Sequence, residues 1–430
     1  MLHKVSKFLC TCFMLSALTA TAQEEEHHHH HHMQEEAQQP DSSASNHQDH
    51  QHASHGMVMP EFKHFPTIAY DEKLEPRPPQ RSSAMTLHGD PKLGKKLAYQ
   101  SDKGRCLNCH VLGQDSEQPG TVGPNLSAYA LRKIKPSVTF QQIWDARVHN
   151  PDTVMPAFGT YNLLTKQEVA HIVAYLQTLK TPVDTPSALP YTVRGVWVVG
   201  EDLTLDENYL EEGKRLFESA GENGSSCTTC HIAGGKGPDL KGIAASYPKW
   251  NEQQERVVLL EQRINLCRSQ FMDSPHYPLG SAESNHLTSY LKSLSRHLPI
   301  RVATDAPTTA AIARGKASFQ HRAGQLNFAC ATCHTTDQPV VGRWLRGEVT
   351  HSFADSDKLY VAAQWPKHFV GGHDQGLQSL QQRIEHCQAV TNTYPLRLGS
   401  PEYVELELYL TSLSNGTPLL APTLSRLRGE

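Results

Sequence analysis

The sequence lacks the long apolar runs of a polytopic membrane protein, since hydrophobic residues make up 38% of its 430 residues and charged residues 20%. It also lacks a large excess of charge, because 40 Lys and Arg stand against 44 Asp and Glu, for a formal net charge of −4. This balance argues against an extended basic surface for nucleic acid. The length suits about three domains, each large enough to bury a core.

Acidic residues are absent from residues 1–22, which begin with Lys4 and Lys7, continue with an apolar stretch over 8–18 and end in Ala-Thr-Ala. This pattern is typical of a cleaved secretory signal peptide, which is too short to anchor the mature chain in a membrane. No small-residue lipobox precedes Cys10 or Cys12, so we do not expect a lipoprotein. The sequence therefore predicts a periplasmic protein without a membrane anchor after cleavage.

Lys and Arg are absent from residues 23–60, which hold seven acidic residues. The whole segment 23–80 is rich in Gln, Glu, Ser, Pro and His, and we expect it to be a disordered tail because it cannot bury enough apolar surface. It contains an unbroken histidine run at 27–32. This run could bind a metal ion, or be low-complexity drift or an inserted purification tag.

The ten cysteines lack the spacing of a disulfide framework, although an even count first suggests one. Two of them leave with the signal peptide, and six of the remaining eight fall in three C-x-x-C-H motifs, at 106–110, 227–231 and 330–334. From residue 81 onward these motifs belong to a pattern that occurs three times. Each copy opens with a helical phrase containing Gly-Lys and closes with an amphipathic helix, and Pro-rich phrases at 181–190 and 303–309 separate the copies. In the first copy, Thr165 is the expected N-cap of the closing helix, whose apolar residues recur at helical spacing: Val169, Ile172, Val173, Leu176 and Leu179.

C-x-x-C-H is the attachment motif of c-type haem, in which two thiols form thioethers and the histidine ligates the iron. The second Cys or His pair that a closed zinc site needs follows none of the motifs. The sequence therefore predicts three covalently bound haems, with six attachment cysteines and three proximal histidines: Cys106, Cys109, Cys227, Cys230, Cys330, Cys333, His110, His231 and His334.

The expected fold is mainly α, with three class I cytochrome c-like domains, each around one haem and with long Gly/Pro loops. We place these domains at 81–185, 186–302 and 303–430. A β-branched segment, 191–199, could form a short strand.

A sixth iron ligand is expected in each domain. In the first, Met155 lies in a Pro/Gly loop between the motif and the closing helix, and His/Met ligation would raise the haem potential. His149 and His171 are the alternatives if Met155 only fills the core. Gly-Pro-Asn-Leu at 123–126 is similar to the loop that supports the proximal histidine in class I cytochromes c.

Two cysteines remain, Cys267 and Cys387, at matching places in an L-x-Q-R-I-x-x-C unit of the second and third copies. Each occupies the position where the first copy has its methionine, so we expect both to be distal haem ligands. A disulfide between them is the alternative. Arg263 and Arg383 precede them by four residues, which on a helix places cation and sulfur on one face. Such a cation should lower the thiol pKa, hold an oxyanion or neutralise a haem propionate.

The third copy is longer between its motif and its last cysteine, 53 residues against 36 in the second. The extra residues include a Gly-rich polar loop at 371–376, which suggests an opened pocket at the third haem. Lys367, His368 and His386 are further cations in this region, and we expect each to lie on a solvated face.

Together these motifs resemble the SoxXA cytochromes of periplasmic sulfur oxidation. Residues 200–430 are similar to the dihaem subunit SoxA, through two C-x-x-C-H motifs, two R-I-x-x-C units and the closing run L-G-S-x-E to Y-L-x-S-L-S-x-G. Residues 85–180 are similar to SoxX, through CLNCH, GPNL, VMPAFG and LTKQEVAHIVAYL. Both subunits would be fused in one chain, with the SoxX part first.

The resemblance implies an L-cysteine S-thiosulfotransferase, which joins thiosulfate oxidatively to a cysteine of the SoxYZ carrier protein. It makes Cys387 both the active-site haem ligand and a persulfide carrier, Arg383 the anion-binding residue, and Cys267 a ligand only. Electrons would pass from the SoxA-like haems to the SoxX-like haem and on to a downstream cytochrome c. Two alternatives remain: a thiosulfate dehydrogenase that forms tetrathionate, and a trihaem electron carrier without enzymatic activity.

Overall fold

The computed structural model describes most of the chain beyond residue 76. The described residues are 77–83, 88–100, 103–116, 120–184, 197–199, 207–231, 237–335, 343–345, 348–349, 353, 362–370, 376–391 and 393–427. The predicted signal peptide, the histidine run and most of the loop 371–376 lie outside them. Among the described residues, no helix combines the length and apolar character needed to cross a membrane.

The first helical unit consists of three α-helices and three short 3₁₀ turns. The helices are α1 (Pro91–Tyr99), α2 (Pro136–Trp144) and α3 (Lys166–Leu176), and the turns are η2 (Cys106–Asn108), η3 (Tyr129–Arg132) and η4 (Ala146–Val148). The N-cap predicted at Thr165 is confirmed, since its side chain accepts from Glu168 N while the Glu168 carboxylate accepts from Thr165 N. The predicted apolar face of α3 is also confirmed, because Val169, Ile172 and Val173 are buried in the core.

The second unit follows the same plan with two added strands. Its elements are α4 (Glu207–Glu218), α5 (Cys227–Cys230), η5 (Ile243–Ser246), β2 (Lys249–Asn251), β3 (Arg256–Val258), α6 (Leu260–Phe271) and α7 (Ala282–Ser293).

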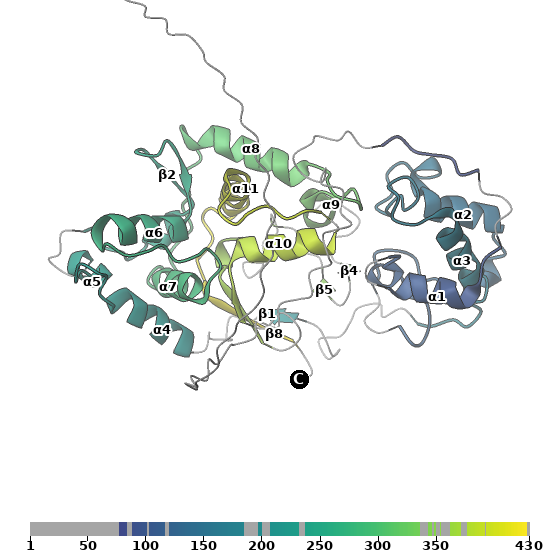
Figure 1. Ribbon diagram of the computed structural model, residues 1–430, viewed down its shortest axis with the longest axis horizontal. Coiled ribbons are helices and arrows are strands. Elements are labelled where there is room, and N and C mark those ends of the chain that lie inside the picture. The colour runs from purple at the N-terminus through teal and green to yellow at the C-terminus, as the bar shows by residue number, and fades with distance from the viewer. Residues whose placement is uncertain are drawn as a thin grey trace, which may run out of the picture. The chain divides into compact units, whose positions relative to one another are not determined.

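The third unit contains α8 (Thr308–Gln320), α9 (Cys330–His334), β4 (Trp344–Leu345), β5 (Glu348–Val349), η6 (Ala362–Gln364), β6 (Lys367–Val370), β7 (Gly376–Gln378), α10 (Leu380–Val390), α11 (Pro401–Ser412) and β8 (Thr423–Leu427). Figure 1 shows α8 crossing over α11, with α10 below them.

A glycine in each opening helix lets that helix approach the closing helix of its unit. A Cβ added at Gly94, Gly213 or Gly315 would lie 1.9, 2.3 or 2.0 Å from a backbone carbonyl oxygen of α3, α7 or α11. The next obstacle is in every case the Cβ of a tyrosine four residues further on: Tyr175, Tyr290 or Tyr409. The Gly-Lys phrase of the sequence repeat therefore marks a close helix crossing that all three units share.

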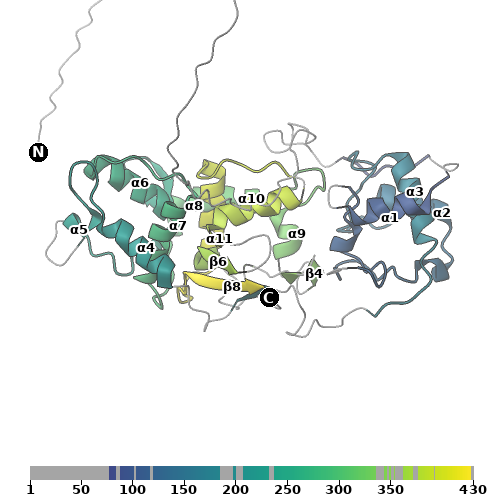
Figure 2. The same ribbon diagram turned by 60° about the horizontal axis from the view of Figure 1, so that its bottom comes forward.

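A four-stranded sheet joins distant parts of the chain, in the order β1-β8-β6-β7. Strand β1 (Trp197–Val199), within the segment where a strand was expected, pairs antiparallel with β8, with Trp197 opposite Leu427. Strand β8 pairs parallel with β6, with Lys367 opposite Thr423, and Figure 2 shows these two strands side by side. This sheet was not expected from the sequence, although the fold is mainly helical as expected.

The second and third units meet through equivalent segments. Gln262, in the first turn of α6, donates from Nε2 to Gly399 O at 3.1 Å, and Gln382, in the first turn of α10, donates to Gly280 O at 3.0 Å. Each glutamine side chain also caps its own helix by accepting from the backbone N–H three residues earlier. The glutamine of each L-x-Q-R-I-x-x-C unit thus connects its helix start to the Leu-Gly-Ser turn of the other unit.

Candidate haem sites and active-site cysteine

Two of the three predicted proximal histidines are held in the tautomer that iron ligation requires. His110 Nδ1 lies 2.7 Å from Pro124 O, and His231 Nδ1 lies 2.9 Å from Pro238 O. A carbonyl oxygen only accepts hydrogen bonds, so Nδ1 carries the proton and Nε2 keeps the lone pair for a metal. A backbone carbonyl in this role also fixes the ring orientation. These residues fit a c-type haem.

A glycine before each of these prolines lets the loop approach the imidazole. A Cβ at Gly123 would lie 2.2 Å from His110 Cε1, and one at Gly237 would lie 2.8 Å from His231 Cε1. Such a supporting loop was expected from the sequence only in the first copy. The signal for the second was present, because Gly-Pro-Asp-Leu at 237–240 repeats Gly-Pro-Asn-Leu at 123–126.

The attachment cysteines are partly buried free thiols. Burial raises the pKa of Cys106 and Cys109 to about 12, and that of Cys227 to about 11. In the third motif, burial raises the pKa of both cysteines to about 12. His334 follows them at the end of α9, with its ring centroid 4.5 Å from that of Phe353. Within the described residues, no three His, Cys, Asp or Glu side chains converge as a metal ion would require.

Of the three sixth-ligand candidates in the first unit, Met155 packs against the hydrophobic core, as do Cys106 and Leu107 of the attachment turn. His171 accepts a hydrogen bond at Nδ1 from Asp90 N, at 2.7 Å, and so supports the start of α1. His149 is exposed and lies beside Gln142. Met155 therefore stays our prediction for the ligand.

Cys267 lies on α6 beside the attachment cysteines of its own unit. It is close enough to Cys227 and Cys230 for its thiolate to repel theirs. Arg263 is one turn earlier on the same helix, as predicted. The expected lowering of the thiol pKa is wrong as a net result. Burial raises the pKa of Cys267, and the opposing charge of Arg263 only reduces that rise.

Cys387 occupies the matching place on α10, beside Cys330 and Cys333. Ser379 and Gln382 form a capping box at the start of this helix, which puts Arg383 and Cys387 one turn apart on one face. Cys387 is exposed, whereas the other seven cysteines of the described chain are partly covered.

The alternative of a disulfide between these two cysteines is wrong. Cys267 is a free thiol. Both cysteines lie beside the attachment motif of their own unit, five residues beyond the glutamines where the two units meet.

The expectation that Lys367 and His368 lie on a solvated face is also wrong. Lys367 is 4% exposed, with Nζ 5.3 Å from the Trp365 ring centroid. His368 Nε2 lies 3.0 Å from the hydroxyl of Tyr209, and His386 is half-buried. Ala-Ala-Gln-Trp-Pro-Lys at 362–367 repeats Ala-Ala-Ser-Tyr-Pro-Lys at 244–249, but this repeat carries no signal for the buried lysine, because the matching Lys249 is exposed. The Ala-Ala pair of each copy is buried.

Known proteins resemble two parts of the chain. The family model described as the cytochrome c domain of SoxA/TsdA matches residues 212–300, and the model described as cytochrome c matches residues 91–180. The L-cysteine S-thiosulfotransferase subunit SoxA of Rhodovulum sulfidophilum is 29% identical over 217 residues, which are 50% of this chain and 71% of that protein. The same subunit of Chlorobaculum tepidum is 30% identical over 237 residues, 55% of this chain and 77% of that protein. The chain belongs to the SoxA family. A solved structure, SoxXA from P. pantotrophus, matches with 24% identity and a TM-score of 0.45 over 51% of this chain and 77% of that chain.

Membership of the SoxA family accounts for the main features of the site. Cytochrome c domains imply covalently bound haem c, which agrees with the attachment motifs and with the histidine tautomers. The cytochrome c match at 91–180 is separate from the SoxA/TsdA match, so this SoxA-family chain carries an additional cytochrome c segment before it.

Proposed function

We propose that this protein is an L-cysteine S-thiosulfotransferase that conjugates thiosulfate to a cysteine of the SoxYZ carrier protein. The observation that carries the proposal is the exposure of Cys387, with Arg383 one turn before it and an attachment motif beside it. An exposed sulfur can meet both a small anion and a cysteine presented by another protein. The names of the SoxA relatives support the same activity.

The reaction joins two sulfur atoms and releases two electrons. A carrier thiol, R–SH, and thiosulfate give R–S–S–SO₃⁻, one proton and two electrons. The haems, when bound, supply the one-electron acceptors that this oxidation needs. Cys387 would carry one added sulfur as a persulfide, whose outer sulfur would bond to the outer sulfur of thiosulfate with loss of one proton and two electrons. The carrier thiol would then take over the thiosulfate group and leave the persulfide restored, so the anion and the carrier need not meet in solution.

Arg383 brings the anion to the sulfur. Thiosulfate is a dianion, and a guanidinium about 4 Å away attracts each unit charge by about 4 kcal/mol at the effective dielectric of a protein surface. The planar guanidinium can also bind two sulfonate oxygens at once, which orients the outer sulfur. Arg263 and Cys267 share this spacing, but Cys267 is less accessible and acts as a ligand only.

We further propose that the chain carries three haems in three cytochrome c-like domains, with the boundaries expected from the sequence. His110, His231 and His334 are the proximal ligands, and Met155, Cys267 and Cys387 are the distal ones. The shared helix crossing at the three glycines supports this division. Thiolate ligation gives the SoxA-like centres lower potentials than the His/Met centre, so electrons leave through the first domain to a downstream cytochrome c.

We also propose that the protein works in the periplasm after removal of residues 1–22. The redox partners of this proposal and covalent haem attachment belong to that compartment. N-terminal sequencing of protein recovered from the periplasm tests the cleavage site, which should follow Ala22.

Matched substitutions in the two R-I-x-x-C units test the catalytic assignment. Cys387→Ala should abolish formation of the carrier–thiosulfate conjugate, whereas Cys267→Ala should retain it. Arg383→Gln should raise the KM for thiosulfate at least tenfold, whereas Arg263→Gln should leave it within about twofold. Mass spectrometry of the wild-type Cys387 peptide should show one added sulfur. Full activity of Cys387→Ala would reject the assignment.

A thiosulfate dehydrogenase is the second candidate, because the matching family model covers both SoxA and TsdA. An assay with thiosulfate but without the carrier separates the two. Tetrathionate formed at the full rate under these conditions favours the dehydrogenase. A simple electron carrier would form neither product.

A further inference from the structure

A buried arginine distinguishes the two SoxA-like haem sites. Arg268 follows Cys267 on α6 and is 8% exposed. Its Nε donates to Pro275 O at 3.0 Å, and its guanidinium carbon lies 3.6 Å from the Tyr277 ring centroid. The side chain is therefore fixed in position by a hydrogen bond and a stacked ring.

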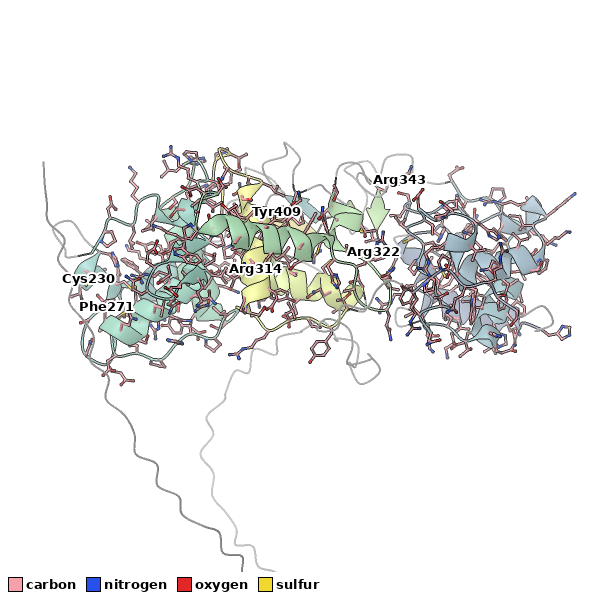
Figure 3. The ribbon with its side chains drawn as sticks, turned by 90° about the horizontal axis from the view of Figure 1, so that it is seen from above. Cys230, Phe271, Arg314, Arg322, Arg343 and Tyr409 are labelled. Carbon is pink, nitrogen blue, oxygen red and sulfur yellow. The ribbon has the colours of Figure 1, made fainter. Side chains whose placement is uncertain are left out.

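No carboxylate of the described chain pairs with this guanidinium, because the only hydrogen bond of its side chain goes to a backbone carbonyl. Buried charges in folded proteins are ordinarily paired, so a guanidinium without a carboxylate partner remains available to attract other negative charge nearby. Arg268 is close enough to Cys227, the first attachment cysteine of the second motif, for its positive charge to favour the thiolate of that cysteine. Figure 3 shows the same end of this unit, with Cys230 of α5 near Phe271, the last residue of α6.

The third unit has a neutral residue at the matching position. Gln388 follows Cys387 on α10, and its side-chain carbonyl accepts a hydrogen bond from the hydroxyl of Tyr403. The position that matches Tyr403 in the second unit is Ser284, which is too short to make this contact. The two sites therefore share a cysteine and an arginine four residues before it, but only the second has a buried arginine directly after the cysteine. The third site has Glu385 and His386 where the second has the uncharged Asn265 and Leu266.

We propose that Arg268 is a positioning residue that raises the reduction potential of the second haem above that of the third. A fixed positive charge stabilises the reduced state of a nearby haem, and burial leaves that attraction poorly screened. The second centre would then accept an electron from the third, where the proposed chemistry occurs. This inference rests on haem attachment at Cys227 and Cys230, and does not depend on which sulfur compound is oxidised.

Potentiometric titration of the full-length holoprotein, followed by absorbance and EPR, tests this inference. Arg268→Gln introduces the residue found in the third unit, and should weaken reduction of one centre at least tenfold, which is 59 mV for one electron. Arg268→Lys should keep most of the wild-type potential. Gln388→Arg should raise a different component by a similar factor. Arg256→Gln removes an exposed charge from the same unit and should change no component detectably.

Unchanged potentials in a fully loaded Arg268→Gln protein would overturn the inference. An equal fall in Arg268→Lys would also overturn it, because the effect would then come from packing and not from charge. If the wild-type protein carried no haem on the Cys227 peptide, both this inference and the proposed haem count would be overturned. If that peptide carried haem and the potentials did not change, only this inference would fail, so peptide mass spectrometry distinguishes the two cases.

Discussion

The close helix crossing in the third unit can be tested with Gly315→Ala. The added Cβ would lie 2.0 Å from Glu405 O and 2.9 Å from Tyr409 Cβ. A carbonyl in the middle of α11 cannot move alone, so α8 and α11 would have to separate by about 1 Å in a closely packed core. Figure 3 shows Arg314 of α8 and Tyr409 of α11 in this region.

Two opposing effects determine the size of the change. Overpacking costs about 1–3 kcal/mol, whereas replacing a helical glycine with alanine gains about 1 kcal/mol from helix propensity. Since the contact is with backbone, we expect the upper part of the cost and a net loss of about 2 kcal/mol in the free energy of unfolding. For a unit of this size the corresponding fall in Tm is roughly 5–12 °C.

Differential scanning calorimetry of the full chain, combined with limited proteolysis to identify the unit that opens first, provides the measurement. Ala313→Gly, at an exposed position of α8, is the control for propensity alone and should cost about 1 kcal/mol. If Gly315→Ala were instead stabilised by 0.5–1 kcal/mol, the reasoning about the helix crossing would be refuted.

Three further predictions concern the first unit. Asp145→Asn should lower the free energy of unfolding by about 3 kcal/mol, because the buried carboxylate accepts hydrogen bonds from Arg147, Thr160 and Gln80 N. Chemical denaturation measures this loss, and Asp152→Asn, at an exposed position, is the control. Burial favours a higher pKa for Asp145, but these hydrogen bonds outweigh burial and hold the pKa below its usual value. The stabilisation should therefore be present at neutral pH and disappear as the pH falls below about 4. An Asn variant whose stability changes with pH in the same way as that of the wild type would contradict this. Met155→Ala should remove the His/Met spectrum of one haem and mainly slow electron exit, measured by reoxidation with an external cytochrome c, whereas unchanged spectra would exclude Met155 as the ligand. Replacing both Cys106 and Cys109 with serine should reduce covalent haem by one third in a haem assay, and a smaller loss would contradict the count of three.

Local patterns in the sequence were sufficient to predict the helices and the attachment turns. The amphipathic spacing of α3, its N-cap at Thr165 and the helical R-I-x-x-C units depend on residues within one or two turns. The Gly-Lys phrases were visible as a repeat, but their function became clear only when the opposing tyrosines were located. Short-range periodicity therefore predicts elements well, and says less about what a given residue contacts.

The features that escaped prediction depend on pairing between distant segments. Strand β8 lies between β1 and β6, which are separated from it by about 230 and 55 residues in the chain, and the strands are too short to identify singly. The burial of Lys367 follows from that sheet, because β6 lies next to β8. The pKa of Cys267 shows the same difficulty in electrostatic form. The helix spacing identified Arg263, whose charge lowers this pKa. Burial raises the pKa by more, and burial depends on the whole fold.

The two R-I-x-x-C units therefore lie in different surroundings, and two of these differences, solvent access and the residue after the cysteine, favour the same assignment of roles. Cys387 is exposed and is followed by a neutral glutamine, whereas Cys267 is partly covered and is followed by a buried arginine. A reaction with a carrier protein needs the accessible sulfur, and a centre that only receives electrons benefits from an added positive charge and from exclusion of solvent. Because access and charge are independent properties, their agreement favours a division of labour in which the third unit performs the sulfur chemistry and the second unit accepts its electrons.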